Sequence, residues 1–341
     1  MTGESGNGLL HEKHTGQNNM MGSLSILIPV YNSEKTIGNL VDVVVETLSQ
    51  QFELLELVLV NDGSKDRSHI CILEAIKKHP GTVKYIRLAR NFGEHNAVMC
   101  GLNYVSGDFI VIIDDDFQNP PSEIVKLVDK LVEGQFDVVY SYYEHKHHSA
   151  FRNFGSALND WFASRLLGKP KGLYLSSFKG IRRNLVQMIT QYRGPYPYID
   201  GIIIRTTENI GRQLCRHDER KVGQSNYTIR KLFQLWLNMF TGFSVVPLRV
   251  SSIIGIIMSM GSFFLMIFFI ISRLVGGILF EQDIPAGWAS LMVVVIFFGG
   301  LHLCVLGLIG EYLGRLCLTI NQTPQFIVQE SYGMNKNQEA G

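Results

Sequence analysis

The fold is decided by a stretch in which an apolar segment runs directly into three carboxylates, FIVIIDDDFQNPP at residues 109–121. Four more short apolar segments lie at residues 24–30, 54–60, 83–88 and 137–141, with amphipathic stretches between them. Apolar runs that alternate with amphipathic stretches are typical of a sheet with crossover helices. The pattern therefore predicts an α/β fold, whose ligands should bind at the carboxyl ends of the strands.

Composition excludes several classes of protein. The chain has 341 residues, 31 of them basic and 30 acidic, so its net charge is near zero. Nothing in this balance indicates a nucleic-acid partner. The five cysteines lie far apart and form no Cys-x-x-Cys pair. This spacing argues against a zinc site and a disulfide framework, and it fits a reducing, cytosolic setting.

The C-terminal third has the composition of a membrane anchor. Residues 250–272 carry no charged side chain, and residues 286–310 form a second such stretch. Each is long enough to cross a bilayer core, and core helices rarely stay uncharged for this length. We therefore predict a two-helix transmembrane hairpin. Basic residues flank it on the side of the large domain, whereas the connection at residues 273–285 has two acidic residues and one Arg, so the domain should be cytosolic and the loop extracytoplasmic.

The remaining boundaries follow from this pattern. Residues 1–22 are rich in Gly, Asn, His and Thr and lack a signal-peptide pattern, so we expect a disordered leader. Residues 23–228 should form the α/β domain and residues 311–341 a cytoplasmic tail. Residues 229–249 have aromatic and apolar side chains at helical spacing. They predict either an amphipathic, membrane-proximal helix or a helix packed on the domain.

The acidic cluster is a candidate metal site. Adjacent carboxylates repel one another, which raises their pKa values unless a cation is present. In an extended turn Asp114 and Asp116 point the same way and Gln118 continues that phase, whereas Asp115 points oppositely and should be replaceable. Oxygen ligands suit Mg²⁺ or Mn²⁺. The alternative is that the acids end a strand and precede a helix that begins at residues 120–122.

Four motifs occur in a fixed order: IPVYN at 28–32, VNDGS at 60–64, RNFG at 90–93 and DDDFQNPP at 114–121. Together they resemble the signatures of family-2 glycosyltransferases with the GT-A fold. Within that family the chain is most similar to polyisoprenyl-phosphate glycosyltransferases, such as dolichyl-phosphate mannose synthase and bacterial undecaprenyl-phosphate glucosyl and aminoarabinose transferases. The resemblance implies a Rossmann-like mixed sheet flanked by helices.

The resemblance also implies roles for single residues. Nucleotide contacts are expected from Pro29, Tyr31, Glu34, Asp62, Arg90 and Asp114. Asp62 would accept a hydrogen bond from a base or ribose. Asp114 and Asp116 become the D-x-D pair, with Asp116 holding the metal that bridges the diphosphate and Gln118 nearby. The segment RKVGQSNY at 220–227 resembles the family pattern R-x-x-G-x-S-x-Y, which places Arg220 and Ser225 near phosphate oxygens.

Other basic and histidine residues leave alternatives open. Arg152, on a predicted helix at 149–167, is a candidate for the acceptor phosphate, and a surface position is the alternative. For Arg220 and its neighbour Lys221 the alternative is a solvated basic face. Three histidines at positions 145, 147 and 148 lack ordered carboxylate or cysteine partners, so a solvated loop is favoured over a metal site.

Two departures from the family pattern bear on the acceptor. Residues 172–177, GLYLSS, lack the usual acidic residue, and residues 144–147, EHKH, replace a common basic pair. Losing a base would disable transfer to a sugar hydroxyl. A phosphomonoester, whose second pKa is about 6, is largely ionised at neutral pH and needs no base. The departures therefore favour a phosphate acceptor, or else a catalytically inactive scaffold.

The sequence thus predicts an inverting glycosyltransferase anchored in the cytoplasmic (inner) membrane by more than one span. It would move a sugar from a nucleotide diphosphate sugar, with UDP favoured, to undecaprenyl or dolichyl phosphate for a cell-envelope glycan or lipid. Alternatives are transfer to a sugar hydroxyl and an inactive membrane scaffold. Gly310 and Gly314, four residues apart, permit close helix packing and a homo-oligomer.

Overall fold

The computed structural model describes residues 21–143, 170, 172–218 and 287–334, with a few positions between 248 and 267. The predicted loop at 273–285 and most of the first predicted span lie outside these residues, as do most of the leader and of the membrane-proximal segment. The predicted leader ended at residue 22, whereas the first strand already begins at Met21.

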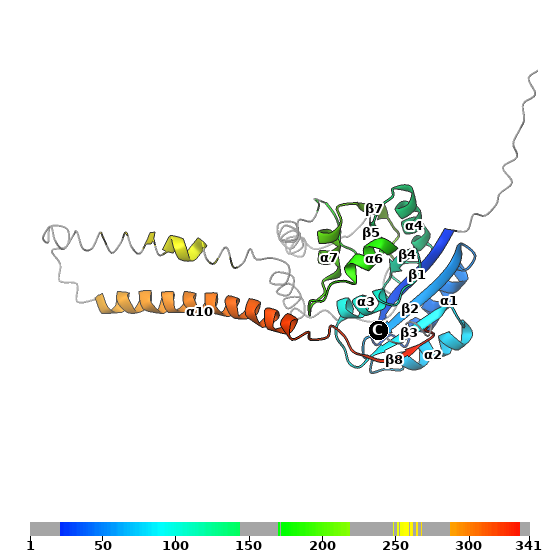
Figure 1. The fold of residues 1–341 in the computed structure, drawn as a ribbon, viewed down its shortest axis with the longest axis horizontal. Helices are drawn as coiled ribbons and strands as arrows, with labels where there is room; N and C mark the ends of the chain where they lie inside the picture. Colours follow the sequence, from blue (N-terminus) through cyan, green and yellow to red (C-terminus); the bar gives the residue numbers. More distant parts are fainter. Residues whose placement is uncertain are drawn as a thin grey trace, which may run out of the picture.

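An eight-stranded mixed sheet forms the centre of the domain, in the order β7-β5-β6-β4-β1-β2-β3-β8 (Figure 1). The strands are β1 (Met21–Val30), β2 (Phe52–Asn61), β3 (Val83–Leu88), β4 (Phe109–Ile112), β5 (Val138–Tyr142), β6 (Lys179–Arg182), β7 (Ile210–Leu214) and β8 (Val328–Tyr332). Strands β4, β1, β2 and β3 are parallel, whereas β6 runs antiparallel to both β4 and β5. All five predicted strands are confirmed, and β6, β7 and β8 were not predicted.

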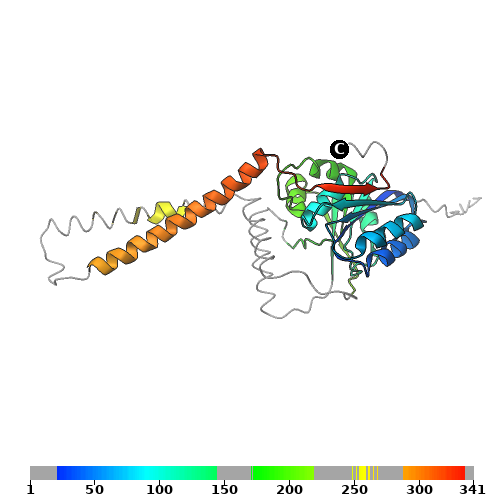
Figure 2. The same ribbon diagram turned by 90° about the horizontal axis from the view of Figure 1, so that it is seen from below.

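Helices cover both faces of the sheet (Figure 2). One face packs against α1 (Ile37–Leu48), α2 (Ser68–Lys78) and α4 (Glu123–Glu133), and the other against α3 (Glu94–Leu102), α6 (Arg183–Ile189) and α7 (Ile199–Thr206). In α1 the buried residues are Ile37, Leu40, Val41, Val44 and Leu48. Their helical spacing puts one apolar stripe on the sheet. The helices on both faces hold the sheet in place, so the loops that follow the parallel strands meet at the carboxyl edge of the sheet.

The C-terminal segment corrects the domain boundary. Residues 311–341 were predicted to be a cytoplasmic tail, yet β8 pairs antiparallel with β3 and completes the sheet. The ring of Tyr332 stacks on that of Tyr85 at 5.8 Å between centroids. An uncovered β3 would expose a row of unpaired backbone N–H and C=O groups. Strand β8 therefore satisfies the outer edge of β3 and becomes the edge strand itself.

A long apolar helix, α10 (Gly287–Ile320), projects from the domain (Figures 1 and 2). Among the described residues, one stretch has the length and composition to cross a membrane, Phe297–Ile320. Its apolar side chains are uncovered, with Leu303 71% exposed. The helix continues beyond residue 310, where the second span was predicted to end. The hairpin stays a prediction because most of the first span lies outside the described residues.

Candidate active site

Four loops meet at the carboxyl edge of the parallel strands. Loop 1 (residues 31–36) follows β1, loop 2 (62–67) follows β2, loop 3 (89–93) follows β3 and loop 4 (113–122) follows β4. Loops 3 and 4 contain the third and fourth motifs, and loops 1 and 2 contain the last residues of the first and second, so the motifs meet at the carboxyl ends of the strands, where ligands were expected. Side chains of one loop bind the backbone of the next, and this bonding shapes the site.

Loops 1 and 2 are joined by reciprocal hydrogen bonds. The Asn32 amide N–H donates to Ser64 Oγ at 3.0 Å, and the Lys65 N–H donates to Asn32 Oδ1 at 2.9 Å. Asn32 has a φ of +56°, a conformation that Asn tolerates better than most residues. Glu34, predicted to contact the nucleotide, is exposed and accepts the Arg67 N–H at 3.0 Å. Part of its carboxylate is therefore engaged within the protein.

Asp62 anchors loop 3. It is 3% exposed and accepts two backbone N–H groups, from Phe92 at 2.7 Å and from Gly93 at 2.8 Å. Burial raises the pKa of Asp62 above its ordinary value, although the two hydrogen bonds act in the opposite direction. The sequence predicted that Asp62 accepts from a base or ribose. That contact stays a prediction, and the structure adds a positioning role that the motif alone does not reveal.

Gly63 lets loops 2 and 3 approach each other. Its φ is +66°, and a Cβ atom there would lie 2.5 Å from the carbonyl carbon of Arg90 and 2.5 Å from the amide nitrogen of Asn91. Both features require glycine. The exposed Arg90 side chain lies over the Phe92 ring, with its guanidinium carbon 4.8 Å from the ring centroid. Its predicted place beside the nucleotide pocket stays a prediction.

Asp115 points toward loop 1. It accepts a hydrogen bond from Ser33 Oγ and another from the Tyr31 N–H at 3.3 Å. Burial raises the pKa of Asp115 to about 6, while these two donors act in the opposite direction. The sequence predicted correctly that Asp115 faces away from Asp114. It also predicted that Asp115 is replaceable, which the contacts with loop 1 argue against.

Asp114 and Asp116 lie at the end of β4. Ser177 Oγ donates to Asp114 Oδ2 at 2.6 Å, and Asp116 is 8% exposed. Burial, followed by the negative charge of Glu94, raises the pKa of Asp114 to about 7, and the hydrogen bond from Ser177 opposes this rise. The two carboxylates thus lie in a region of concentrated negative charge.

The chain turns sharply after Asp116. Phe117 has a φ of +61°, and the Gln118 N–H donates to Asp116 Oδ1 at 3.1 Å. The expectation that Gln118 continues the phase of Asp114 and Asp116 assumed an extended chain. Because this turn is not extended, the alternation of side chains ends at Asp116. The predicted metal contact of Gln118 thus loses its argument from periodicity and stays a prediction.

The residues fit a divalent cation that is shared with a substrate. Within the described ranges, no group of three or more His, Cys, Asp and Glu side chains is arranged to hold a metal ion by itself. Mg²⁺ commonly uses one or two carboxylates and takes its other ligands from substrate phosphates and water. Burial, and after it the charge of Glu94, raises the pKa of Asp114, and a bound cation would favour the ionised form of this carboxylate. Asp114 and Asp116 match this kind of site.

A buried ion pair lies behind Asp114. Lys179, in β6, is paired with Ile112 across the sheet and makes a salt bridge with Asp200 of α7. The Tyr140 hydroxyl also donates to Asp200 at 2.9 Å. Sequence reasoning missed this pair and the contact of Ser177. Lys179 and Ser177 lie in a segment without a recognisable motif, and the antiparallel pairing of β6 with β4 brings this segment to the site.

Three predicted site residues, Arg152, Arg220 and Ser225, lie outside the described residues, as do positions 144–147. Pro29 is half-buried in β1, where it pairs with Val60. The structure brings together Tyr31, Glu34, Asp62, Arg90, Asp114, Asp116 and Gln118 on the four loops described above.

Comparisons with known proteins identify relatives of the chain. Residues 25–194 match the model of "Glycosyl transferase family 2". The undecaprenyl-phosphate 4-deoxy-4-formamido-L-arabinose transferase of Proteus mirabilis (strain HI4320) is 32% identical over 94% of this chain and 98% of its own length. The protein of the same name from Photorhabdus laumondii is 31% identical over 93% of this chain and 96% of its own length.

Among solved structures, glucosyl-3-phosphoglycerate synthase from Mycobacterium tuberculosis, crystallised with Mn²⁺ and UDP, is 19% identical, with a TM-score of 0.44. The alignment covers 64% of this chain and 77% of that one.

The mixed sheet and the acidic loop after β4 define the protein as a glycosyltransferase with the GT-A fold. The whole-length likeness is more specific, because it includes the C-terminal segment as well as the domain. The chain belongs to glycosyl transferase family 2. The predictions of the fold, the family and the enzyme class are confirmed.

Proposed function

We propose that this enzyme transfers a sugar from a nucleotide diphosphate sugar to polyprenyl phosphate, with inversion at the anomeric carbon. The observation that carries the proposal is the likeness to undecaprenyl-phosphate sugar transferases along 94% of the chain. A likeness confined to the α/β domain would support the donor half of the reaction alone. Here the likeness also includes the apolar helix α10. Within the described residues, α10 has the length and composition to cross a membrane, which is where a lipid acceptor resides.

A phosphate acceptor is supported by the residue that contacts Asp114, which is Ser177. The segment before β6, where the family pattern has an acidic residue able to act as a base, presents the hydroxyl of Ser177 instead. A hydroxyl bonded to a carboxylate is a poor general base. A phosphate acceptor needs none, since its oxygen is already ionised near neutral pH. The task left to the protein is to position the phosphate in line with the departing diphosphate and to exclude water.

The bonded loops have separate tasks in this proposal. Loops 1 to 3 form the cradle for the nucleoside, held in shape by Asp62 and Asp115. Asp114 and Asp116 would hold Mg²⁺ or Mn²⁺, with Gln118 as a further candidate. When bound, such an ion supplies Lewis-acid stabilisation to the leaving diphosphate. Ser177 helps to fix the orientation of Asp114, because its hydroxyl donates to one carboxylate oxygen, Oδ2, and does not engage the other.

The finer assignments are part of the same proposal. The donor is a UDP-sugar, and the catalytic domain lies on the cytoplasmic side of the inner membrane with the chain crossing more than once. Arg152, Arg220 and Ser225 bind the acceptor phosphate. Gly310 and Gly314 are accessible on α10, and nothing lies within 4 Å of a Cβ built on either, which leaves room for a second helix of a homo-oligomer.

The test uses the purified full-length chain with Mn²⁺ or Mg²⁺, undecaprenyl phosphate and a panel of UDP- and GDP-sugars. We expect metal-dependent transfer to the lipid, lost in Asp116→Ala. The control is Glu133→Ala, an exposed carboxylate at the end of α4, which should behave like the wild type. If the chain transfers sugar to a hydroxyl acceptor and never to the lipid phosphate, the proposal is wrong.

A further inference from the structure

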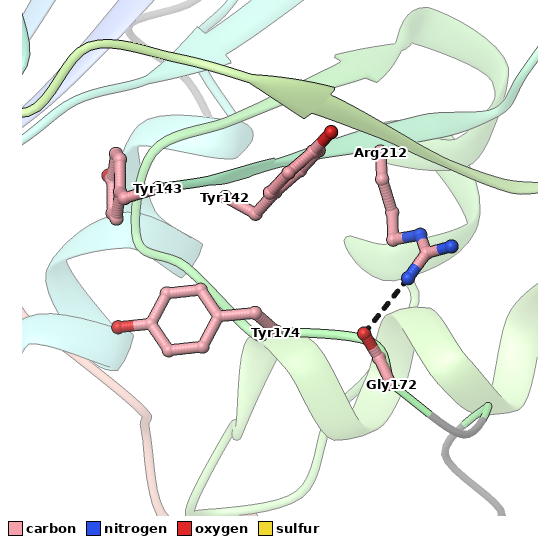
Figure 3. Close-up of a pocket in the computed structure, with 5 residues that line it drawn as sticks. All are labelled: Tyr142, Tyr143, Gly172, Tyr174 and Arg212. Carbon is pink, nitrogen blue, oxygen red and sulfur yellow. Dashed lines mark hydrogen bonds between the residues drawn. The ribbon is translucent and has the colours of Figure 1, made fainter. Parts of the chain in front are cut away.

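A tyrosine-lined pocket lies beside the acidic loop, and no role has been given to it above. It has a volume of about 270 Å³ and is lined by Tyr142, Tyr143, Gly172, Tyr174 and Arg212. In Figure 3 Tyr143 and Tyr174 lie on one side, Arg212 and Gly172 on the other, and Tyr142 between them. Arg212 Nη1 donates to the Gly172 carbonyl at 3.0 Å. We call this the tyrosine pocket.

The tyrosine pocket is connected to the acidic loop through Tyr143. The Tyr143 hydroxyl donates to Asn119 Oδ1 at 2.8 Å, and Asn119 lies three positions after Asp116 in the sequence. The Tyr143 ring also packs edge-on against the Tyr174 ring, with centroids 6.2 Å apart. Tyr143 thus forms the wall between the acidic loop and the pocket. A molecule in the pocket is next to the reaction site without occupying the metal position.

The sheet order shows which substrate reaches this place. The nucleotide loops follow β1, β2 and β3 on one side of β4, whereas the pocket is built on β5 and β7 on the other side. Strands β5 and β7 are two and three places from β4, which is roughly 10 to 14 Å at about 4.8 Å per strand. In an in-line substitution the acceptor enters opposite the leaving group. Because the pocket and the nucleotide loops lie on opposite sides of β4, the pocket is on the side left for the acceptor.

The lining indicates an apolar occupant. Three of the five lining residues are tyrosines, none is acidic, and Tyr142 and Tyr174 are 41% and 44% exposed as whole residues. Aromatic rings gain most from burial against apolar groups. Arg212 is engaged with Gly172, whose φ of +74° marks a turn, so its contact holds that wall of the pocket. The volume admits a short apolar segment and not a whole polyprenyl chain.

We propose that the tyrosine pocket binds the isoprene units nearest the phosphate of the lipid acceptor. This inference rests on the proposed function, since it assigns part of the acceptor site. The phosphate lies between the pocket and the acidic loop, and the proximal isoprene units pack on Tyr142 and Tyr174. The enzyme would therefore select an isoprenoid phosphate by contacts outside the membrane, in addition to any provided by the lipid bilayer.

The experiment compares two soluble acceptors with the full-length enzyme. Farnesyl phosphate has three isoprene units and dimethylallyl phosphate has one. In the wild type we expect the KM for farnesyl phosphate to be lower by about tenfold or more, because additional apolar groups are buried. In the variant carrying Tyr142→Ala and Tyr174→Ala this advantage should shrink to less than about threefold, while the KM for the donor stays unchanged.

The matched control is the variant with Tyr142→Phe and Tyr174→Phe, which keeps both rings and should keep the preference for farnesyl phosphate. Both tyrosines are exposed, so the alanine variant should fold, and its unfolding temperature checks this. An unchanged preference in the alanine variant overturns the inference, and a raised KM for the donor alone assigns the pocket to the sugar instead. If the wild type uses no isoprenoid phosphate at all, the proposed function itself is wrong, and the assignment of the pocket falls with it.

Discussion

The bonds of Asp62 give the sharpest test of the site's architecture. Its carboxylate accepts the N–H groups of Phe92 and Gly93 at 2.7 and 2.8 Å and is 3% exposed. Hydrogen bonds to a charged group contribute about 1.5 to 3 kcal/mol each. Asp62→Ala removes both acceptors and should therefore lower the free energy of unfolding by about 3 to 6 kcal/mol. Asp62→Asn keeps one acceptor and should lose roughly half as much.

The assay is thermal unfolding without any nucleotide. For a domain of this size 1 kcal/mol corresponds to about 2 to 4 °C, so Asp62→Ala should lower the unfolding temperature by on the order of 10 °C. Asp62→Asn should fall between that variant and the wild type. The control is Asp129→Asn, a half-buried carboxylate on α4, which should shift the temperature by less than about 2 °C.

The opposite pattern would refute the reasoning. If Asp62 serves only the nucleotide, both substitutions will raise the KM for the donor and leave the unfolding temperature of the free protein unchanged. A lower unfolding temperature together with a raised donor KM would mean that Asp62 acts by holding loop 3 in place. Measuring both quantities on the same preparations separates the two roles.

Three further substitutions test other parts of the structure. Gly63→Ala places a Cβ 2.5 Å from the backbone of loop 3 at a φ of +66°, so we expect a raised KM for the donor, measured by initial rates. Asp115→Ala leaves the Tyr31 N–H without its acceptor and should lower stability by about 1 to 3 kcal/mol, measured by denaturant unfolding; an unchanged midpoint would restore the prediction that it is replaceable. Glu56 is buried, which would raise its pKa, but hydrogen bonds from Lys84, Ser106 and Ser25 lower that pKa overall. The lowered pKa stabilises the protein above a pH of about 4.3, and this contribution is lost as the pH falls through the folded-state pKa. Glu56→Gln should therefore unfold at a lower temperature at pH 7 and lose less stability between pH 6 and pH 3 than the wild type. Parallel curves of stability against pH would contradict the role of the salt bridge between Lys84 and Glu56.

The C-terminal strand shows where prediction from sequence failed. Strand β8 follows the apolar helix, is short and has no strong alternation of apolar residues, and the ion pair between Arg87 and Glu330 joins residues 243 positions apart. A local pattern contains no information about such a pairing. Strands β6 and β7, four and five residues long, escaped prediction for the same reason.

The sequence by itself determined the parallel strands, the order of the four motifs and the acidic cluster, because apolar periodicity and turn residues are local properties. Only the tertiary structure decided how those acids are used. Asp62 and Asp115 bind the backbone of neighbouring loops, whereas Asp114 receives the hydroxyl of Ser177. A carboxylate's role depends on which donors lie within about 3 Å of it, and strands distant in sequence supply those donors.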